Sequence, residues 1–407
     1  MEKNWIVDEI DKIATIGQDG HGVTRLAFSP DDIAAREYVV NLMRENGLTV
    51  RIDEIGNVIG RLEGTDPQAA AVVTGSHLDT VPQAGKFDGV VGVIGGIAAL
   101  RELQSRGPLT HPVEIIVFAG EESSRFGVAT IGSRVMAGLN NIHSLRKLKD
   151  QNGISLSQLL NDQGFDINNI SKAVRSNSDI KAFIELHIEQ GAVLDQDSNK
   201  IGVVEAVAAP ARCKIIVEGT AAHSGTTPMD DRQDALVSAA MIIVAINEIA
   251  LERSARGIVG TVGAMKVHPG AINVVPGLVE MWVDIRGVDH QSIVECLQEI
   301  KDAVSEITER QNTAVSIEML SSERPVSMDR DIIKLVSDIC REKGIRYRRM
   351  NSGAGHDAMN IAKITKAGLI FIPCKNGISH NPDEFASAED IQIGVEVLVE
   401  TLYQLAK

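Results

Sequence analysis

Apolar and polar positions follow two periods along the first half of the chain. Residues 29–47 carry apolar side chains at helical spacing, begin with a Ser-x-x-Asp capping pattern and end in Asn-Gly, which predicts a helix. Residues 90–107 are mostly apolar and stop at a Gly-Pro pair, which predicts a buried helix. Short β-rich runs predict strands around these helices: residues 48–64, 69–77, 111–122 and 180–191. This order predicts an α/β fold, with a mainly parallel mixed sheet sandwiched by helices.

The pattern changes at about residue 210 and changes back at about residue 325. The intervening segment predicts an α+β unit, a small sheet covered by two helices: strands in 211–220, 257–287 and 313–320, and helices in 234–254 and 290–311. Helix and strand patterns of the first kind then resume in residues 329–344, 367–374 and 388–407. We therefore expect one α/β domain made of residues 1–209 and 326–407, with residues 210–325 inserted as a second domain.

Composition and charge narrow the class of protein. A chain of 407 residues exceeds what one hydrophobic core usually organises, and 44% hydrophobic with 23% charged residues is ordinary for a soluble globular protein. A formal net charge of −15 disfavours nucleic acid and anionic membranes as partners, because both need a basic surface. An anionic substrate would therefore need a local cation.

The N-terminal residues mix charged and apolar side chains and lack the plan of a secretory signal, so we expect a cytoplasmic protein. The longest apolar stretch, residues 89–100, is too short to span a bilayer. The cysteines are far apart, contain no C-x-x-C pair and are expected to be reduced and buried: Cys213, Cys296, Cys340 and Cys374.

Polar side chains follow several predicted strands, where ligands gather in α/β sheets. His77 and Asp79 follow an apolar run. In extended backbone, residues i and i+2 point the same way, so the Asp79 carboxylate could lie behind the His77 imidazole, as carboxylates often do at metal ligands. Taken alone, this pair is more typical of a solvated turn.

Two further strand ends carry similar groups. Glu121 and Glu122 point in different directions, so one could bind a metal while the other faces a water, although an acidic helix start explains them equally well. His187 shares a strand face with Glu185 and Glu189, which is also typical of an exposed antiparallel strand.

The remaining candidates are His380, in a polar loop after another apolar strand, and Asp88, alone in a glycine-rich stretch. Polar loops are common, so each signal by itself is modest. Together, three histidines and several acids form a nitrogen and oxygen donor set that suits Zn²⁺ or a similar ion such as Mn²⁺, Co²⁺ or Ni²⁺. The two oxygens of Asp88 could bridge two such ions.

Eight motifs, in order along nearly the whole chain, resemble the hydantoinase/carbamoylase amidases: "GSHLDTV…GKFDG", "AGEESSRF", "ELHIEQG", "AAHSGTTPM", "INVVPG", "DIRG", "SGAGHDAM" and "GISHNPDEF". These amidases are a branch of the two-metal aminoacylase and carboxypeptidase superfamily, and include N-carbamoyl-L-amino acid hydrolases, allantoate amidohydrolases and one type of β-ureidopropionase. The resemblance therefore implies two divalent metal ions per subunit.

The resemblance also implies a role for each matching position. Glu121 matches the general base, and Asp79 matches the carboxylate behind a metal ligand. Histidine at position 187, where the peptidase branches usually have an acid, favours the carbamoylase branch. The metal ligands match five positions, with Asp88 bridging: His77, Asp88, Glu122, His187 and His380.

The inserted domain resembles the family's lid and dimerisation domain, which implies a homodimer. His223 matches a lid residue that helps to hold the developing oxyanion, and Asn273 and Arg286 match substrate contacts, Arg286 as a carboxylate clamp. Gln190 and His356 match substrate contacts on the catalytic domain. Without the resemblance, a loop position would explain His223 and a strand-end charge would explain Arg286.

These roles predict the hydrolysis of N-carbamoyl-L-amino acids to L-amino acid, ammonia and carbon dioxide. Glu121 would take a proton from water and return it to the leaving nitrogen, a role typically worth ~10²–10⁴-fold in rate. Arg286 would bind the substrate carboxylate bidentately and supply the local cation that the net charge demands.

Other functions remain open at this point. Allantoate amidohydrolase is the nearest alternative, followed by another aminoacylase-like amidase or peptidase; residues 203–225 look more like the carbamoyl hydrolases. A nucleotide-binding oxidoreductase would need G-x-G-x-x-G, which the glycines of residues 89–96 do not form. A catalytically inactive homologue would have lost a metal ligand, and every matching position keeps one.

Overall fold

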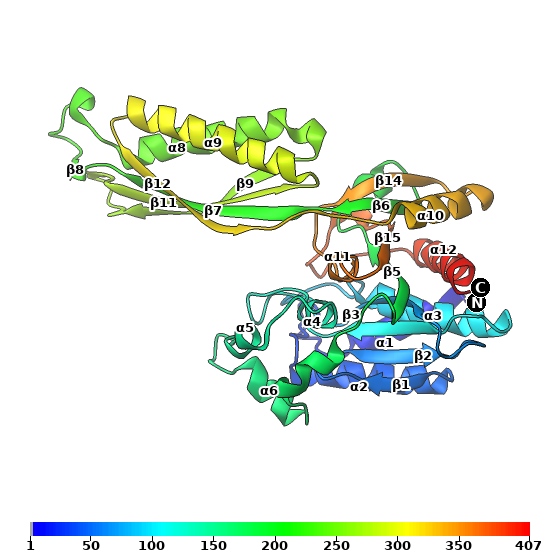
Figure 1. The fold of residues 1–407 in the computed structure, drawn as a ribbon. Coiled ribbons are helices and arrows are strands. Elements are labelled where there is room, and N and C mark those ends of the chain that lie inside the picture. The colour runs from blue at the N-terminus through cyan, green and yellow to red at the C-terminus, as the bar shows by residue number, and fades with distance from the viewer. Residues whose placement is uncertain (1–2) are drawn as a thin grey trace. The chain divides into compact units, whose positions relative to one another are not determined.

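A computed structural model describes residues 3–407. These residues form two compact units (Figure 1). The first unit runs to Glu205 and resumes at Ser327. The second unit comprises Ala206–Val326. The sequence pattern changes at nearly the same two places, about 210 and 325.

The first unit is built on a mixed sheet with a parallel centre. Four neighbouring strands form this centre in the order β4-β3-β5-β15 and run parallel: β4 (Val113–Phe118), β3 (Ala71–His77), β5 (Ile180–Ile188) and β15 (Lys366–Ile372). Antiparallel pairing occurs on both margins, β1 (Thr49–Ile52) with β2 (Val58–Leu62) and β6 (Ile201–Val207) with β15. β13 (Val326–Ser327) and β14 (Tyr347–Ser352) lie beside β6. The sequence prediction of a mainly parallel mixed sheet is confirmed.

Helices cover both faces of this sheet, which explains why β3, β4 and β5 are buried along nearly their whole length. The side chain of Leu186 in β5 packs against Gly95 in α3 (Val90–Ser105). The neighbouring Glu185 accepts a hydrogen bond from the main-chain N–H of Ala358, the first residue of α11 (Ala358–Ile361). Because successive side chains of a strand point to opposite faces, α3 and α11 lie on opposite sides of the sheet.

The predicted long helices of this unit are present. α2 (Pro30–Glu45) is capped by Ser29, whose hydroxyl accepts from the main-chain N–H of Asp32, as the capping pattern predicts. Shorter segments between β4 and β5 form a separate small hydrophobic cluster that the pattern did not predict. The other helices of the unit are α1 (Lys3–Ala14), α4 (Ile131–Met136), α5 (Ile142–Arg146), α6 (Leu156–Asp162), η1 (Ile167–Ala173), α7 (Val193–Gln196), α10 (Arg330–Glu342), η4 (Lys375–Gly377) and α12 (Ala388–Ala406).

The second unit is an antiparallel sheet with two helices on one face (Figure 1). The strand order is β12-β7-β11-β9: β12 (Ala314–Ser322), β7 (Ala209–Glu218), β11 (Leu278–Gly287) and β9 (Val259–His268). Along β11 buried and partly exposed residues alternate strictly, and the buried face packs on α8 (Ala235–Glu252) and α9 (His290–Arg310). A two-stranded ribbon adds β8 (Ala222–His223) and β10 (Val274–Val275), and η2 (Met229–Asp231) and η3 (Ser254–Arg256) are single turns.

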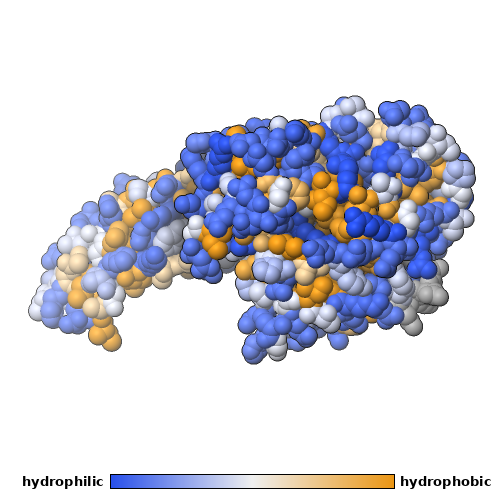
Figure 2. All heavy atoms as spheres, turned by 90° about the horizontal axis from the view of Figure 1, so that it is seen from below, coloured by the Kyte–Doolittle hydropathy of each residue, from blue (hydrophilic) through white to orange (hydrophobic). Residues whose placement is uncertain are grey.

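One helix in residues 3–407, α8, is long and apolar enough to cross a membrane by length and composition alone. Only 33% of it is buried, and its buried face packs into the core of the second unit. On the face shown in Figure 2, hydrophobic residues form groups among hydrophilic ones. The four cysteines are buried and unpaired, as expected.

Candidate metal centre

The four parallel central strands bring the predicted metal ligands to one edge of the first unit's sheet. His77 is the last residue of β3, and His187 is the second-last residue of β5. Glu122 follows β4 after a short turn, and His380 lies in the loop after β15. Neighbouring parallel strands place their carboxyl ends at the same edge, so side chains distant in sequence meet there.

Asp88 stands between two groups of these ligands and offers each a different oxygen. Its Oδ1 lies 3.6 Å from Nε2 of His77 and 3.1 Å from Nε2 of His187. Its Oδ2 lies 3.1 Å from Nε2 of His380, and that nitrogen lies 3.2 Å from Oε1 of Glu122. The ligand atoms of each group lie within 4.8 Å of one another. The two groups therefore share one carboxylate, and each could hold a metal ion.

The chemistry of the donors fits a divalent transition ion in each group. Nδ1 of His77 lies 2.9 Å from the main-chain oxygen of Asp79, and Nδ1 of His187 lies 2.8 Å from that of Ile188. A carbonyl oxygen only accepts, so each Nδ1 carries a proton, which leaves Nε2, on the side of Asp88, as the atom that could bind an ion. Imidazole nitrogen combined with carboxylate oxygen is a donor set of Zn²⁺ and similar ions.

The carboxylate of Asp79 lies beside the imidazole of His77 without a hydrogen bond to it. Its Oδ1 is 4.0 Å from Nδ1 of His77, whose partner is the main-chain oxygen of Asp79 instead. β3 ends at His77, so the side-chain alternation of a strand does not extend to residue 79. The carboxylate accepts from the main-chain N–H groups of Glu121 (3.1 Å) and Glu122 (2.9 Å). Asp79 therefore orients the two acids after β4.

Glu121 lies beside the group that contains His77 and belongs to neither group. Its Oε2 is 3.8 Å from Nε2 of His77, while the adjacent Glu122 contacts His380. Burial raises the pKa of Glu121 well above its usual value, and the negative charges of Glu122 and Asp357 add to this, against the opposing charge of His77. A carboxylate with a raised pKa is suited to accept a proton from water.

Gln190 and His356 lie against the same site, each bound to a protein group. Nε2 of Gln190 donates to Oδ2 of Asp88 (2.7 Å). Nε2 of His356 lies 2.9 Å from Oγ of Ser352, and its ring centroid lies 4.6 Å from that of His187. Burial lowers the pKa of His356 well below its usual value, and the charge of His187 acts in the same direction, so His356 is neutral.

A third cluster, Glu185 with His187 and His356, has the spacing of a cation site. However, both carboxylate oxygens of Glu185 already accept hydrogen bonds, from the hydroxyl of Ser76 (2.9 Å) and the main-chain N–H of Ala358 (2.8 Å). Glu185 thus joins β5 to β3 and α11 behind the metal ligands. It lies on a buried central strand, which overturns the alternative that this polar face belongs to an exposed antiparallel strand.

Within the second unit, two of the three predicted substrate residues lie together. His223 pairs with Val274 in the β8–β10 ribbon, and the main-chain N–H of Ser224 donates to the oxygen of Asn273 (3.1 Å). This ribbon joins the sheet next to Leu278, the first residue of β11. Arg286 lies near the other end of β11, roughly 26 Å from Leu278 at about 3.3 Å per residue. The structure therefore separates Arg286 from His223 and Asn273 within this unit.

The model of Peptidase family M20/M25/M40 matches residues 73–404. The chain belongs to this peptidase family. Within the M20/M25/M40 family it is 37% identical to the N-carbamoyl-L-amino-acid amidohydrolase of Paenarthrobacter aurescens, over 98% of this chain and 97% of that protein. It is 35% identical to the allantoate amidohydrolase of Escherichia coli strain K12, over 98% and 97%.

A solved structure agrees with this placement in the M20/M25/M40 family. The chain superimposes on a hydantoinase/carbamoylase family amidase from Burkholderia multivorans with a TM-score of 0.93 and 34% identity, covering 100% of this chain and 98% of that one. The resemblance to hydantoinase/carbamoylase amidases that the motifs indicate is confirmed.

Two polar residues of the centre were not predicted. Ser379 lies 3.3 Å from Oδ2 of Asp88, and the buried Glu384 accepts from the main-chain N–H of Asp88 (3.1 Å). Both lie in the same motif as His380, "GISHNPDEF". The sequence feature that could have identified them is therefore their nearness to a candidate ligand. Sequence alone could not show that this loop turns back onto the Asp88 segment.

Proposed function

We propose that this protein hydrolyses the carbamoyl (ureido) C–N bond of N-carbamoyl-L-amino acids, giving L-amino acid, ammonia and carbon dioxide. The observation that carries the proposal is Asp88, whose two oxygens face two His/carboxylate groups, with Glu121 beside them and bound to neither. The similarity to an N-carbamoyl-L-amino-acid amidohydrolase along 98% of the chain supports the substrate class.

The proposed cofactors are two divalent metal ions per subunit, Zn²⁺ first and Mn²⁺, Co²⁺ or Ni²⁺ as alternatives. His77, His187 and Asp88 would hold one ion, and Asp88, Glu122 and His380 the other. Such ions, when bound, polarise a carbonyl and acidify water. The Nε2 atoms of His187 and His380, which lie beside different oxygens of Asp88, support this assignment.

The protein's own residues would perform the remaining work. Glu121 takes the proton of the attacking water and delivers it to the leaving nitrogen. His223 donates to the developing oxyanion, and Asn273 and Arg286 bind the substrate, Arg286 through its carboxylate. Gln190 and His356 line the substrate on the catalytic unit.

We further propose that the protein is a cytoplasmic homodimer joined through the inserted unit. α8 exposes three apolar side chains that a partner could cover: Val237 (41%), Val244 (55%) and Leu251 (69%). The separation of Arg286 from the His223–Asn273 pair gives a second reason. If both contact one small substrate, they must come from different copies of the chain. Buried, unpaired cysteines suit a reducing compartment.

An ammonia-release assay on two substrates tests the function. We expect release from N-carbamoyl-L-methionine, dependent on added divalent metal, and slower or no release from allantoate. Activity on allantoate alone would reject the proposed substrate class. The absence of bound transition metal together with no metal-dependent hydrolysis would instead indicate an inactive homologue.

Allantoate amidohydrolase remains the second candidate, for a specific reason. The relative of that name in Escherichia coli is 35% identical, close to the 37% of the carbamoyl hydrolase, and covers the chain equally well. The metal centre would serve either substrate, because both present a ureido group and a carboxylate. The two-substrate assay therefore decides between the functions, and mutation of the metal ligands does not.

A further inference from the structure

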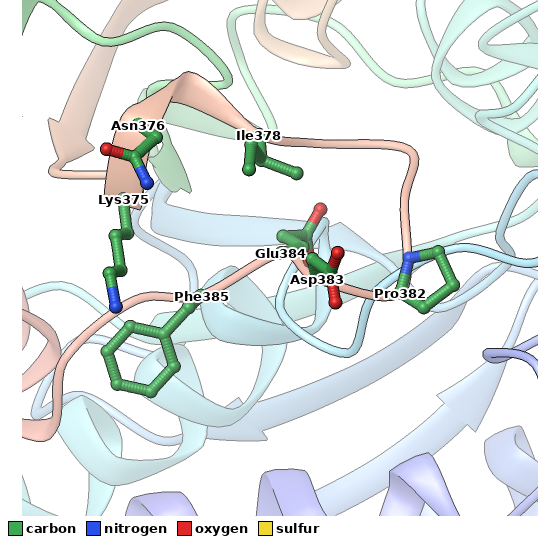
Figure 3. A pocket seen from close by; sticks show the side chains of 7 residues that line it. All are labelled: Lys375, Asn376, Ile378, Pro382, Asp383, Glu384 and Phe385. Atoms are coloured by element: carbon green, nitrogen blue, oxygen red, sulfur yellow. The ribbon is translucent and has the colours of Figure 1, made fainter.

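The loop after β15 lines a pocket of about 440 Å³ and contains two adjacent acids with different surroundings (Figure 3). Asp383 is exposed, whereas Glu384 is only 4% exposed. Both carry a carboxylate, yet only Glu384 reaches the segment that holds Asp88. The other lining residues are Lys375, Asn376, Ile378, Pro382 and Phe385.

Glu384 ties the His380 loop to the Asp88 segment. Its Oε1 accepts from the main-chain N–H groups of Phe87 (2.9 Å) and Asp88 (3.1 Å), and its Oε2 accepts from the hydroxyl of Ser379 (2.8 Å). A Cβ atom at Gly85 would lie 2.3 Å from Cβ of Glu384, so the glycine permits this close approach. All three donors are neutral, and they use both oxygens of the carboxylate.

The hydroxyl of Ser379 has one proton and two carboxylates within reach. Oδ2 of Asp88 lies 3.3 Å from Oγ of Ser379, and Oε2 of Glu384 lies 2.8 Å from it. The shorter contact takes the proton, because a hydroxyl can donate only one hydrogen bond. The hydroxyl of Ser379 therefore donates its hydrogen bond to Glu384 and not to Asp88.

The direction of that proton matters because Oδ2 of Asp88 has few free acceptor positions. A carboxylate has about four lone-pair sites, two on each oxygen. Nε2 of Gln190 occupies one on Oδ2, at 2.7 Å. An ion held with His380 and Glu122 would need the other. A proton from Ser379 at Oδ2 would compete with that ion.

We propose that Glu384 is a positioning residue of the metal centre: it fixes the main chain at Asp88 and draws the Ser379 hydroxyl proton away from Oδ2. Both oxygens of Asp88 then stay available, one to each cation site. The effect is unequal between the sites, because only the site of His380 and Glu122 uses Oδ2. This inference rests on the two-ion centre proposed above.

The test measures Zn²⁺ affinity of the full-length protein, by competition of the metal-free form with a chromophoric chelator. The wild type is expected to bind two ions. In Glu384→Gln the side-chain amide donates to Ser379, whose proton then turns to Asp88. We expect the ion at the His380 site to bind ~10–100-fold more weakly, the usual effect of losing an outer hydrogen-bond partner of a metal ligand. The other ion should change less.

A second substitution separates this role from a merely structural one. Removing the hydroxyl in Glu384→Gln/Ser379→Ala should restore most of the lost affinity, because no proton remains to block Oδ2. Neither loss of charge nor loosening of the loop would be rescued in this way. Asp383→Asn, with the same chemical change one residue away on an exposed side chain, should bind both ions as the wild type does.

The outcomes separate the role of Glu384 from the proposed centre. Wild type that binds fewer than two ions would reject the centre itself. Two ions in wild type, with unchanged binding in Glu384→Gln or no recovery in the double variant, would reject only the role of Glu384. If Glu384→Gln does not fold, Ser379→Ala alone decides: affinity at or above that of wild type is expected, and a tenfold loss would overturn the inference.

Discussion

The two units of the chain place their predicted functional residues in opposite ways. In the first unit, one sheet edge gathers residues from four strand ends, and their ligand atoms lie within 4.8 Å of one another in each cluster. In the second unit, the ribbon of His223 and Asn273 lies next to Leu278 at one end of β11, and Arg286 lies roughly 26 Å from Leu278 along the strand. The candidate metal ligands therefore meet at one sheet edge, whereas the proposed substrate residues of the second unit lie at different ends of its sheet.

The difference follows from the two kinds of sheet. Parallel strands joined by helical crossovers all end at one edge, so a site forms there whatever the distance in sequence. Antiparallel strands turn back on themselves and distribute their loops over both ends of the sheet. Residues at the two ends of such a sheet cannot contact the same small substrate within one copy.

The largest expected effect concerns the metal centre. Glu121→Gln should lower kcat by ~10²–10⁴-fold, because the amide cannot take a proton from water, and should keep the metal content of the wild type. The same change at the neighbouring residue, Glu122→Gln, should lower metal content, and so should His187→Ala. Metal analysis and steady-state kinetics measure both effects. An active Glu121→Gln would show that the base is wrongly assigned.

The second prediction concerns the separated residues of the inserted unit. His223→Ala should lower kcat by ~10²–10³-fold as an oxyanion donor is lost, and Arg286→Met should mainly raise KM. A purified heterodimer with one change in each copy should regain roughly half of wild-type activity, because one of its two sites then has both residues intact. A heterodimer as inactive as its parents would place both residues in the site of one copy.

The third prediction uses metal to distinguish the two units. Zn²⁺ at 100 times its Kd should stabilise the first unit by about 2.7 kcal/mol, equal to ~100-fold slower amide exchange through unfolding of the site. Hydrogen–deuterium exchange should show this in the segments of His77, Asp88 and His187. The strands of the second unit, β7 to β12, should exchange at the same rate with metal or chelator. Equal slowing in both units would contradict a centre confined to the first.

The smallest expected effect concerns the ion pair between Asp284 and Arg286. Asp284 contacts its guanidinium at 3.2 and 3.3 Å, and both side chains are partly exposed. A pair of this exposure is worth roughly 0.2–1 kcal/mol, so Asp284→Asn should raise KM by about 1.4- to fivefold with kcat unchanged. The change should be far smaller than that of Arg286→Met. A fall in KM would mean that Asp284 competes with the substrate.

Sequence alone predicted the elements and the ligand types well, for physical reasons. The buried strands β3, β4 and β5 are short apolar runs between turn signals, and each has a residue with metal-binding chemistry at or shortly after its carboxyl end. The convergence of His77, His187 and His380 then follows from the parallel order of their strands.

Contacts that depend on loop geometry could not be predicted in the same way. The carboxylate of Asp79 faces two main-chain N–H groups, because β3 ends before it and alternation no longer applies. Gln190 contacts Asp88 although 102 residues separate them in sequence. The role of Glu384 depends on a loop that turns back over nearly 300 residues of chain, and no local pattern records such a return.

The glycines of α3 limit which substitutions the enzyme tolerates. In a nucleotide-binding motif, such glycines would instead have approached phosphates. A Cβ atom at Gly92 would lie 2.3 Å from the main-chain oxygen of Leu186 in β5, so the helix rests directly on the strand that carries His187. Asp88 lies just before this helix. A single methyl group at position 92 would push the helix outward and move Asp88 away from His77 and His187. Substitution of Gly92 should therefore impair catalysis, although Gly92 contacts neither ion nor substrate.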